Sequence, residues 1–234
     1  MTGEHPLARI LRGAALGAPP PPDGGIEILP PLDGPVDAVC AFTAHNVIAA
    51  AVPGDEIRAH LDPEDLGSPM SAGFLAWLAA RLGTVPGVVD AVLVAPAEPA
   101  VPQAAVARRD DLWEHPRVAR SLRYRNDLRV YADPAGDGVL MVGRGLAGRW
   151  EMSFEVDPGA RGRGLGRSLV AAARSLIPAG EPLFAQCSPG NAASLRAILA
   201  AGYRPIGAEC LFLRSPRWGP DAGRREPAIV RGDG

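Results

Sequence analysis

Residues 154–168, FEVDPGARGRGLGRS, are the stretch that decides the fold we expect for this chain. The segment begins with strand-forming residues, breaks at Asp157-Pro158 and crosses a turn that contains three glycines and two arginines. After the turn, apolar residues recur with the period of a helix. A strand, a glycine-rich turn and a helix N-terminus form a device that binds phosphate, because unpaired N–H groups and the helix dipole both favour an anion there.

The length and charge of the chain narrow the class of protein. Its 234 residues suit one large domain or two small ones, and a formal net charge of −2 does not indicate a nucleic-acid partner. The three cysteines form no C-x-x-C pair, and the four histidines lack metal-ligand spacing. No apolar run reaches the roughly 18 residues of a membrane span, and no signal-peptide core is visible. We therefore expect a cytoplasmic protein without a metal site and without a membrane partner.

Composition divides the chain into four parts. Residues 1–35 are rich in proline and glycine, and we predict a flexible leader there. Residues 36–103 combine an apolar strand at 36–47, two helices and a buried strand at 88–94, which predicts an N-terminal α/β lobe. Residues 104–214 form the main predicted domain, and residues 215–234 are rich in arginine, proline and glycine, which predicts a flexible tail.

The main domain begins with three strands in succession. Apolar and polar residues alternate at 122–131 and at 149–156, with a short apolar run at 139–142 between them. Three short strands joined by tight turns predict an antiparallel meander. A helix follows the glycine turn, then a strand at 183–187, a helix capped by Asn191, and one or two strands at 203–213.

A second glycine cluster competes for the role of nucleotide site. Residues 143–148, GRGLAG, match the dinucleotide-binding pattern G-x-G-x-x-G letter for letter. That pattern also requires a helix to begin there and an acidic residue about 20 positions later. This chain instead continues with the alternating strand, and it has Arg163 where the acidic residue would be needed. We therefore interpret residues 143–148 as a glycine-rich hairpin turn.

The first glycine cluster carries a family resemblance. The pattern Val156-x-Pro158-x-x-R-G-R-G-L-G, which ends at residues 161–166, resembles the acetyl-CoA-binding motif of the GNAT N-acetyltransferase superfamily. Asn191, followed 11 and 12 residues later by Gly202-Tyr203, is similar to a later signature of that family. The resemblance implies an α/β fold with a mixed, mostly antiparallel sheet flanked by helices, to which we add the N-terminal lobe. It also implies transfer of an acetyl group from acetyl-CoA to a primary amine.

The resemblance further assigns binding residues. The pyrophosphate of acetyl-CoA would lie on backbone amides of the glycine turn, with arginine side chains adding positive charge. The strand ending at Val156 would diverge from the strand at 183–187, so that its backbone is free to pair with the pantetheine arm. The cofactor-binding residues predicted in this way are Phe154, Val156, Arg161, Gly162, Arg163, Gly164, Leu165, Gly166, Arg167, Ser168 and Asn191.

The catalytic residues are less completely matched. The family resemblance assigns Glu151 as the general base that takes a proton from the amine, and Glu155 shares its strand face. Where many family members carry a tyrosine that protonates the leaving thiolate, this chain has Ile198. A CoA-binding module without catalysis is therefore the alternative function. We expect a small-molecule or peptide amine as the acceptor, and a homodimer is left open.

Overall fold

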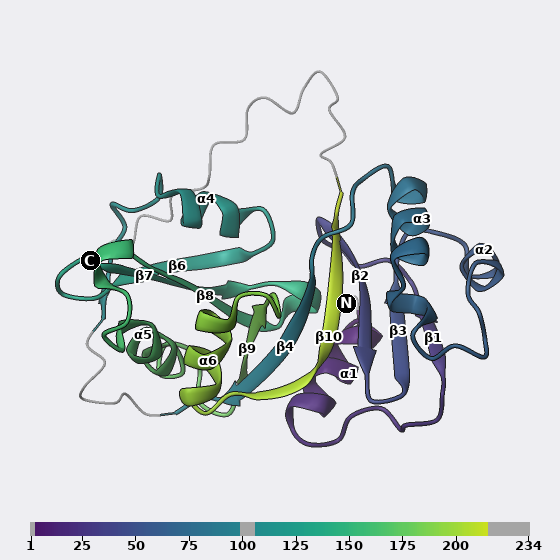
Figure 1. Ribbon diagram of the computed structural model, residues 1–234, viewed down its shortest axis with the longest axis horizontal. Coiled ribbons are helices and arrows are strands. Elements are labelled where there is room, and N and C mark those ends of the chain that lie inside the picture. Colours follow the sequence, from purple (N-terminus) through teal and green to yellow (C-terminus); the bar gives the residue numbers. More distant parts are fainter. Residues whose placement is uncertain (1–2, 99–105, 215–234) are drawn as a thin grey trace.

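A single mixed sheet organises the part of the chain that the computed structural model describes, residues 3–98 and 106–214. Its ten strands lie in the order β1-β3-β2-β10-β4-β9-β8-β7-β6-β5, and helices pack on both sides (Figure 1). The pairs β1/β3 and β8/β9 are parallel and all other neighbours are antiparallel. The predicted mixed, mostly antiparallel sheet flanked by helices is confirmed.

Strands and α-helices alternate one by one only from α5 to β10, and runs of two or three strands occur before that. The strands are β1 Ile26–Leu29, β2 Val36–Phe42, β3 His45–Ala49, β4 Val89–Pro96, β5 Ala107–Arg108, β6 Asn126–Ala132, β7 Gly138–Arg144, β8 Trp150–Val156, β9 Pro182–Cys187 and β10 Arg204–Leu213. The α-helices are α1 Pro6–Ala15, α2 Gly54–Ala59, α3 Ala72–Leu82, α4 Pro116–Leu122, α5 Leu165–Ala173 and α6 Ala192–Ala200.

The order of elements predicted for the C-terminal half is present. Strands β6, β7 and β8 form the antiparallel meander, and the glycine turn leads into α5, then β9, α6 and β10. One boundary was wrong: the segment 122–131, predicted as a strand, begins with the end of α4, and β6 starts only at Asn126. Pro116 begins helix α4, a position that suits proline because the first helical N–H has no partner within the helix.

The structure does not show the additional lobe that we predicted for residues 36–103. Strand β4 lies between β9 and β10, and β10 in turn pairs with β2, so the two halves of the chain exchange strands within one sheet (Figure 1). Gly207 allows this close pairing, since a Cβ at that position would lie 2.2 Å from the carbonyl oxygen of Ala41. The predicted boundary near residue 103 therefore does not divide two separate hydrophobic cores.

The predicted flexible leader is also corrected. Pro6 starts helix α1, and the side chain of His5 caps it by accepting a hydrogen bond from the amide of Leu7. Leu7 and Leu11 lie one helical turn apart, are buried and pack against the sheet in one cluster with Val92. Strand β1 is the second regular element in this segment. The tail predicted at 215–234 lies outside the described residues.

The N-terminal strand predicted at 36–47 is a hairpin. Strands β2 and β3 pair in antiparallel fashion around a turn at Ala44, whose φ is 48°. The two predicted helices that follow are confirmed as α2 and α3. Ser71 caps α3 and Gly83 ends it in the left-handed conformation.

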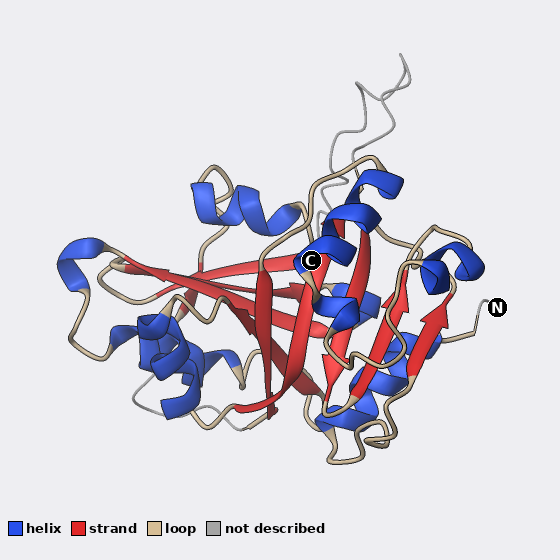
Figure 2. Ribbon diagram, turned by 45° about the vertical axis from the view of Figure 1, so that its right-hand side comes forward, coloured by secondary structure: helices blue, strands red, loops and turns tan. Residues whose placement is uncertain are grey.

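Side-chain alternation fixes which helices cover each face of the sheet. Helices α1 and α4 pack on the face that carries Cys40, Phe184 and Met141. Helices α2, α3, α5 and α6 pack on the opposite face, in clusters that include Val39 and Leu93. Figure 2 shows helices on both sides of the sheet. No helix in the two described ranges is both long and apolar enough to span a bilayer.

Candidate active site

The principal cleft, with a volume of about 990 Å³, lies where β8 and β9 move apart. The two strands pair only from Trp150 opposite Leu183 to Met152 opposite Ala185, although β8 continues to Val156. This divergence was predicted, and it leaves the edge of β8 beyond Met152 free of a strand partner on that side. The cleft is lined by this edge, the glycine turn, helices α4 and α6, and one end of β4.

The glycine turn presents a row of unused backbone donors to the cleft. Gly162 and Gly164 have φ angles of 78° and 86°, a left-handed conformation that only glycine adopts without strain. Within the described residues, the amides of residues 162–167 have no hydrogen-bond acceptor, and no side chain caps the N-terminus of α5. Arg161 stiffens the entry to the turn, because its Nε donates a 3.0 Å hydrogen bond to the carbonyl oxygen of Val156. These groups fit a pyrophosphate, which needs several donors at once.

Most of the predicted cofactor-binding residues lie together along this cleft. The ones that line it are Phe154, Val156, Arg161, Gly162, Gly164, Leu165, Gly166, Arg167 and Asn191. Arg163 and Ser168 do not line it, although Arg163 is exposed in the same turn. Asn191 caps α6 by accepting a 3.2 Å hydrogen bond from the amide of Ser194.

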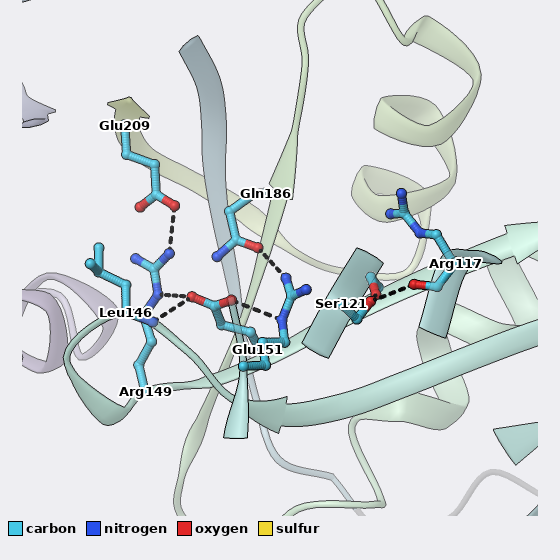
Figure 3. Close-up of polar contacts among 9 residues, drawn as sticks. Arg117, Ser121, Leu146, Arg149, Glu151, Gln186 and Glu209 are labelled. Atoms are coloured by element: carbon cyan, nitrogen blue, oxygen red, sulfur yellow. Dashed lines mark hydrogen bonds and ion pairs between the residues drawn. The ribbon is translucent and has the colours of Figure 1, made fainter. Parts of the chain in front are cut away.

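Glu151 lies at the centre of a buried polar network (Figure 3). Its Oε1 accepts hydrogen bonds from Arg149 Nε at 2.8 Å and from the amide of Leu146 at 3.1 Å. Its Oε2 lies 2.9 Å from Nε of Arg125, whose other end donates to Gln186. The side chains of Glu151, Arg149 and Arg125 are only 2%, 4% and 10% exposed.

Two further features complete this network. Arg149 also donates to Glu209 of β10 at 2.7 Å, so two arginines and two glutamates balance in charge (Figure 3). Gly145 leaves space for the side chain of Glu151, because a Cβ at position 145 would lie 2.2 Å from the carboxyl carbon of that glutamate. The second glycine cluster is therefore the predicted turn between β7 and β8, and its middle glycine admits a buried carboxylate.

This geometry argues against the role of general base that we predicted for Glu151. Burial raises the pKa of Glu151, but the positive charges of Arg149 and Arg125 outweigh burial and hold the pKa below its usual value. A carboxylate that is stabilised by two arginines and a backbone amide has little tendency to take up a proton. Glu155, the other predicted carboxylate, is exposed at the cleft and forms no ion pair within the described residues.

Sequence reasoning missed the polar side chains on the α4 side of the cleft. Asp90 of β4 lines the cleft, and burial raises the pKa of its carboxyl group although Arg120 and Arg117 oppose that shift. Its signal in the sequence is that it is the one charged residue within the apolar run 88–94. Arg117 and Arg120 line the cleft from α4.

The position at which many members of the resembled family carry a tyrosine is occupied here by Ile198, whose side chain cannot donate a proton. Ile198 lines the cleft and is 2% exposed, so an apolar group occupies that position. Tyr203 is buried in the core, and its hydroxyl donates to the carbonyl oxygen of Val170. Of the three tyrosines in the chain, only Tyr124 lines the cleft.

Comparison with known proteins gives only distant likenesses. No protein-family model and no curated protein matches the chain. Similar solved structures include a GNAT-family acetyltransferase from Colwellia psychrerythraea, at 12% identity and a TM-score of 0.39, and a GCN5-related N-acetyltransferase from Kribbella flavida, at 14% and 0.40. The matches cover 62% and 61% of this chain and 63% and 64% of those chains, less than two thirds of their length. These values are too low to carry an argument about family or function.

Proposed function

We propose that this protein is an acyltransferase that moves an acetyl group from acetyl-CoA to a primary amine. The observation that carries the proposal is the row of unpaired amides at residues 162–167, which opens into the same cleft as the divergence of β8 and β9. A phosphate site and an exposed strand edge side by side suit a ligand with a pyrophosphate and an amide-containing arm. Arg161 and Arg167 line the same end of the cleft and add positive charge.

In the proposed reaction the residues of this chain bind, orient and exchange protons. The free edge of β8 beyond Met152 pairs with the amide-containing arm, and a backbone N–H there supports the carbonyl oxygen during transfer. A new bond forms between the amine nitrogen and the acetyl carbon, the carbon–sulfur bond breaks, and CoA leaves as a thiolate that takes up a proton. Asp90 is the group we propose as the acceptor of the proton that the amine loses, because its raised pKa makes it a better base than Glu151.

Binding of acetyl-CoA to a turn variant tests the proposal. In Gly164→Ala the added methyl group lies in open space, but φ of 86° becomes strained and the amides of residues 162–167 lose their alignment. Gly180→Ala is the matched control, since Gly180 also has a positive φ, 80°, with open space around it and lies outside the cleft. Calorimetry should show acetyl-CoA binding that weakens by about tenfold or more in the Gly164 variant only. No binding to the unmodified protein would refute the proposal.

A CoA-binding module without catalysis is the second candidate, and Ile198 is the observation that favours it. An isoleucine cannot protonate a leaving thiolate. Release of free thiol from acetyl-CoA, measured with a panel of amines, separates the two candidates. Saturable release that depends on the amine supports the enzyme. Tight binding of acetyl-CoA with no release from any amine supports the module.

A further inference from the structure

Helix α4 carries two arginines that face the cleft without an ionic partner. Arg117 and Arg120 are three residues apart, which places them on neighbouring positions of one helix face, and both line the cleft. Within the described ranges neither has a carboxylate oxygen within 4.0 Å, and the buried Nε of Arg117 has no hydrogen-bond partner. A partly buried guanidinium with unused donors is costly unless an anion satisfies it.

The surroundings of Arg117 strengthen this requirement. Burial lowers the pKa of Arg117, and the positive charges of Arg120 and Arg125 lower it further, more than the negative charges of Glu155 and Asp90 raise it. Arg125 is already neutralised by Glu151. On the α4 side of the cleft, Arg117 and Arg120 are therefore the arginines that lack a carboxylate within ion-pair distance among the described residues.

Arg117 and Arg120 are separate from Arg161 and Arg167, the arginines that we propose to lie at the phosphates. Helix α4 lies on one face of the sheet, and helices α5 and α6 lie on the other, as Figure 1 shows for the two sides of β8. The cleft joins both sides through the divergence of β8 and β9. The arginines proposed to bind the phosphates thus line the cleft from the glycine turn and the start of α5, while Arg117 and Arg120 line it from α4.

The same cleft also holds carboxylates that suit an ammonium group. Asp90 lines the cleft close enough to Arg117 and Arg120 for their charges to act on it, and Glu155 adds a second, exposed carboxylate. A ligand that fits both sets of groups carries an amine and an anionic group together. Because Asp90 and Glu155 offset part of the positive charge, a single negative charge fits better than the double charge of a phosphate.

We propose that the amine acceptor carries a carboxylate, as a free amino acid does, and that Arg117 and Arg120 bind this carboxylate while Asp90 faces the amine. The fork of donors on arginine matches the two oxygens of a carboxylate. This inference rests on the proposed function and names the substrate class for the same cleft.

Paired substrates test this inference through catalysis. Each of the twenty amino acids is compared with its own carboxamide, which keeps the amine and the side chain but removes the negative charge, and thiol release from acetyl-CoA is measured. We expect the best amino acid to exceed its amide in kcat/KM by about tenfold to a hundredfold, the effect of losing a charged hydrogen bond. Arg117→Gln and Arg120→Gln should remove this preference. Arg123→Gln is the matched control, because Arg123 is exposed at the end of α4 and does not line the cleft.

The outcomes separate this inference from the proposed function. If amino acids and their amides are acetylated equally well, the inference is overturned while the proposed acyltransferase activity is supported. The same holds if phosphoethanolamine is acetylated better than every amino acid. Absence of transfer to any amine counts against the acyltransferase alone. In that case the arginine pair is tested by calorimetry with N-acetylated amino acids and their amides in the presence of CoA. Equal binding of acid and amide, or binding of neither, then overturns the inference.

Discussion

Replacing Glu151 by glutamine distinguishes a structural glutamate from a catalytic one. The substitution removes one negative charge from a network in which Glu151 and Arg149 are nearly inaccessible and Arg125 is largely buried. Removing one partner of a buried ion pair costs about 3–5 kcal/mol, because the remaining charge stays buried without compensation. Glutamine keeps an oxygen that can accept from the amide of Leu146, so we expect a loss near the lower end, about 3 kcal/mol.

Urea unfolding followed by circular dichroism measures this loss at neutral pH. Glu155→Gln is the control from the same strand, and its exposed side chain predicts a change within about 0.5 kcal/mol. The pH dependence gives a second readout. The pKa of Glu151 is lower in the folded protein than in the unfolded chain, so ionised Glu151 stabilises the fold at any pH above the ordinary carboxyl pKa. This stabilisation is lost as pH falls through the pKa that Glu151 has in the folded protein. The unmodified protein should therefore lose more stability on acidification than Glu151→Gln does.

The same variant can refute the structural role. If Glu151→Gln unfolds within about 1 kcal/mol of the unmodified protein and acetyl transfer falls by about a hundredfold or more, Glu151 is the base and the network does not hold its charge. The measured quantity is the difference in the free energy of unfolding between Glu151→Gln and the unmodified protein at each pH. Burial raises the pKa of Glu209 in both proteins, so the effect of this glutamate on the pH dependence of stability has the opposite sign to that of Glu151 and is common to both.

Two further predictions concern the base and the N-terminal helix. Asp90→Asn should lower kcat by about a hundredfold and remove the acid limb of the pH profile of kcat/KM. The reason is that burial raises the pKa of Asp90, and the carboxylate forms only above that raised value. An acid limb that persists in the variant excludes Asp90 as its source. The groups whose charges interact with Asp90 are Arg117 and Arg120 of α4, Cys187 of β9, and Glu209 and Cys210 of β10. Leu11→Ala should destabilise the protein by about 2–5 kcal/mol in urea unfolding, since Leu11 is 2% exposed. The control Leu16→Ala changes a residue that is 67% exposed, and it should change stability by no more than about 0.5 kcal/mol. Equal effects of the two substitutions would mean that α1 does not pack on the sheet.

Local patterns were sufficient to predict the glycine turn and its neighbours. The alternation along β8, the left-handed glycines and the helix after them are all encoded within about twenty residues, and the rival cluster at residues 143–148 was rejected because no helix comes after it. Helix α1 was missed because the prolines around it dominated the composition. Pro6 at the first helical position and the four-residue spacing of Leu7 and Leu11 were the signals that could have revealed it.

Strand order and buried charge pairing could not be predicted in this way. Arg149 and Glu209 are 60 residues apart, and nothing in either segment indicates that β10 brings them within 2.7 Å. Likewise, an alternating strand pattern places Glu151 on a face but does not say which arginines cover that face. The family resemblance therefore suggested a general base at Glu151, whereas the sheet register produced a buried carboxylate in ion pairs with Arg125 and Arg149.

The insertion of β4 between β9 and β10 changes what the N-terminal half does. As a separate lobe, residues 36–103 would have had no part in the cleft. As a strand of the same sheet, β4 supplies Asp90 at the point where β8 and β9 have moved apart, opposite the arginines of α4. The proposed CoA-binding residues thus come from the C-terminal half, and the proposed base comes from the N-terminal half. In the proposed reaction, binding of the acyl donor and removal of the proton from the acceptor would both depend on one shared sheet. A change in the register of β4 would then disturb proton removal before it disturbed binding of the donor.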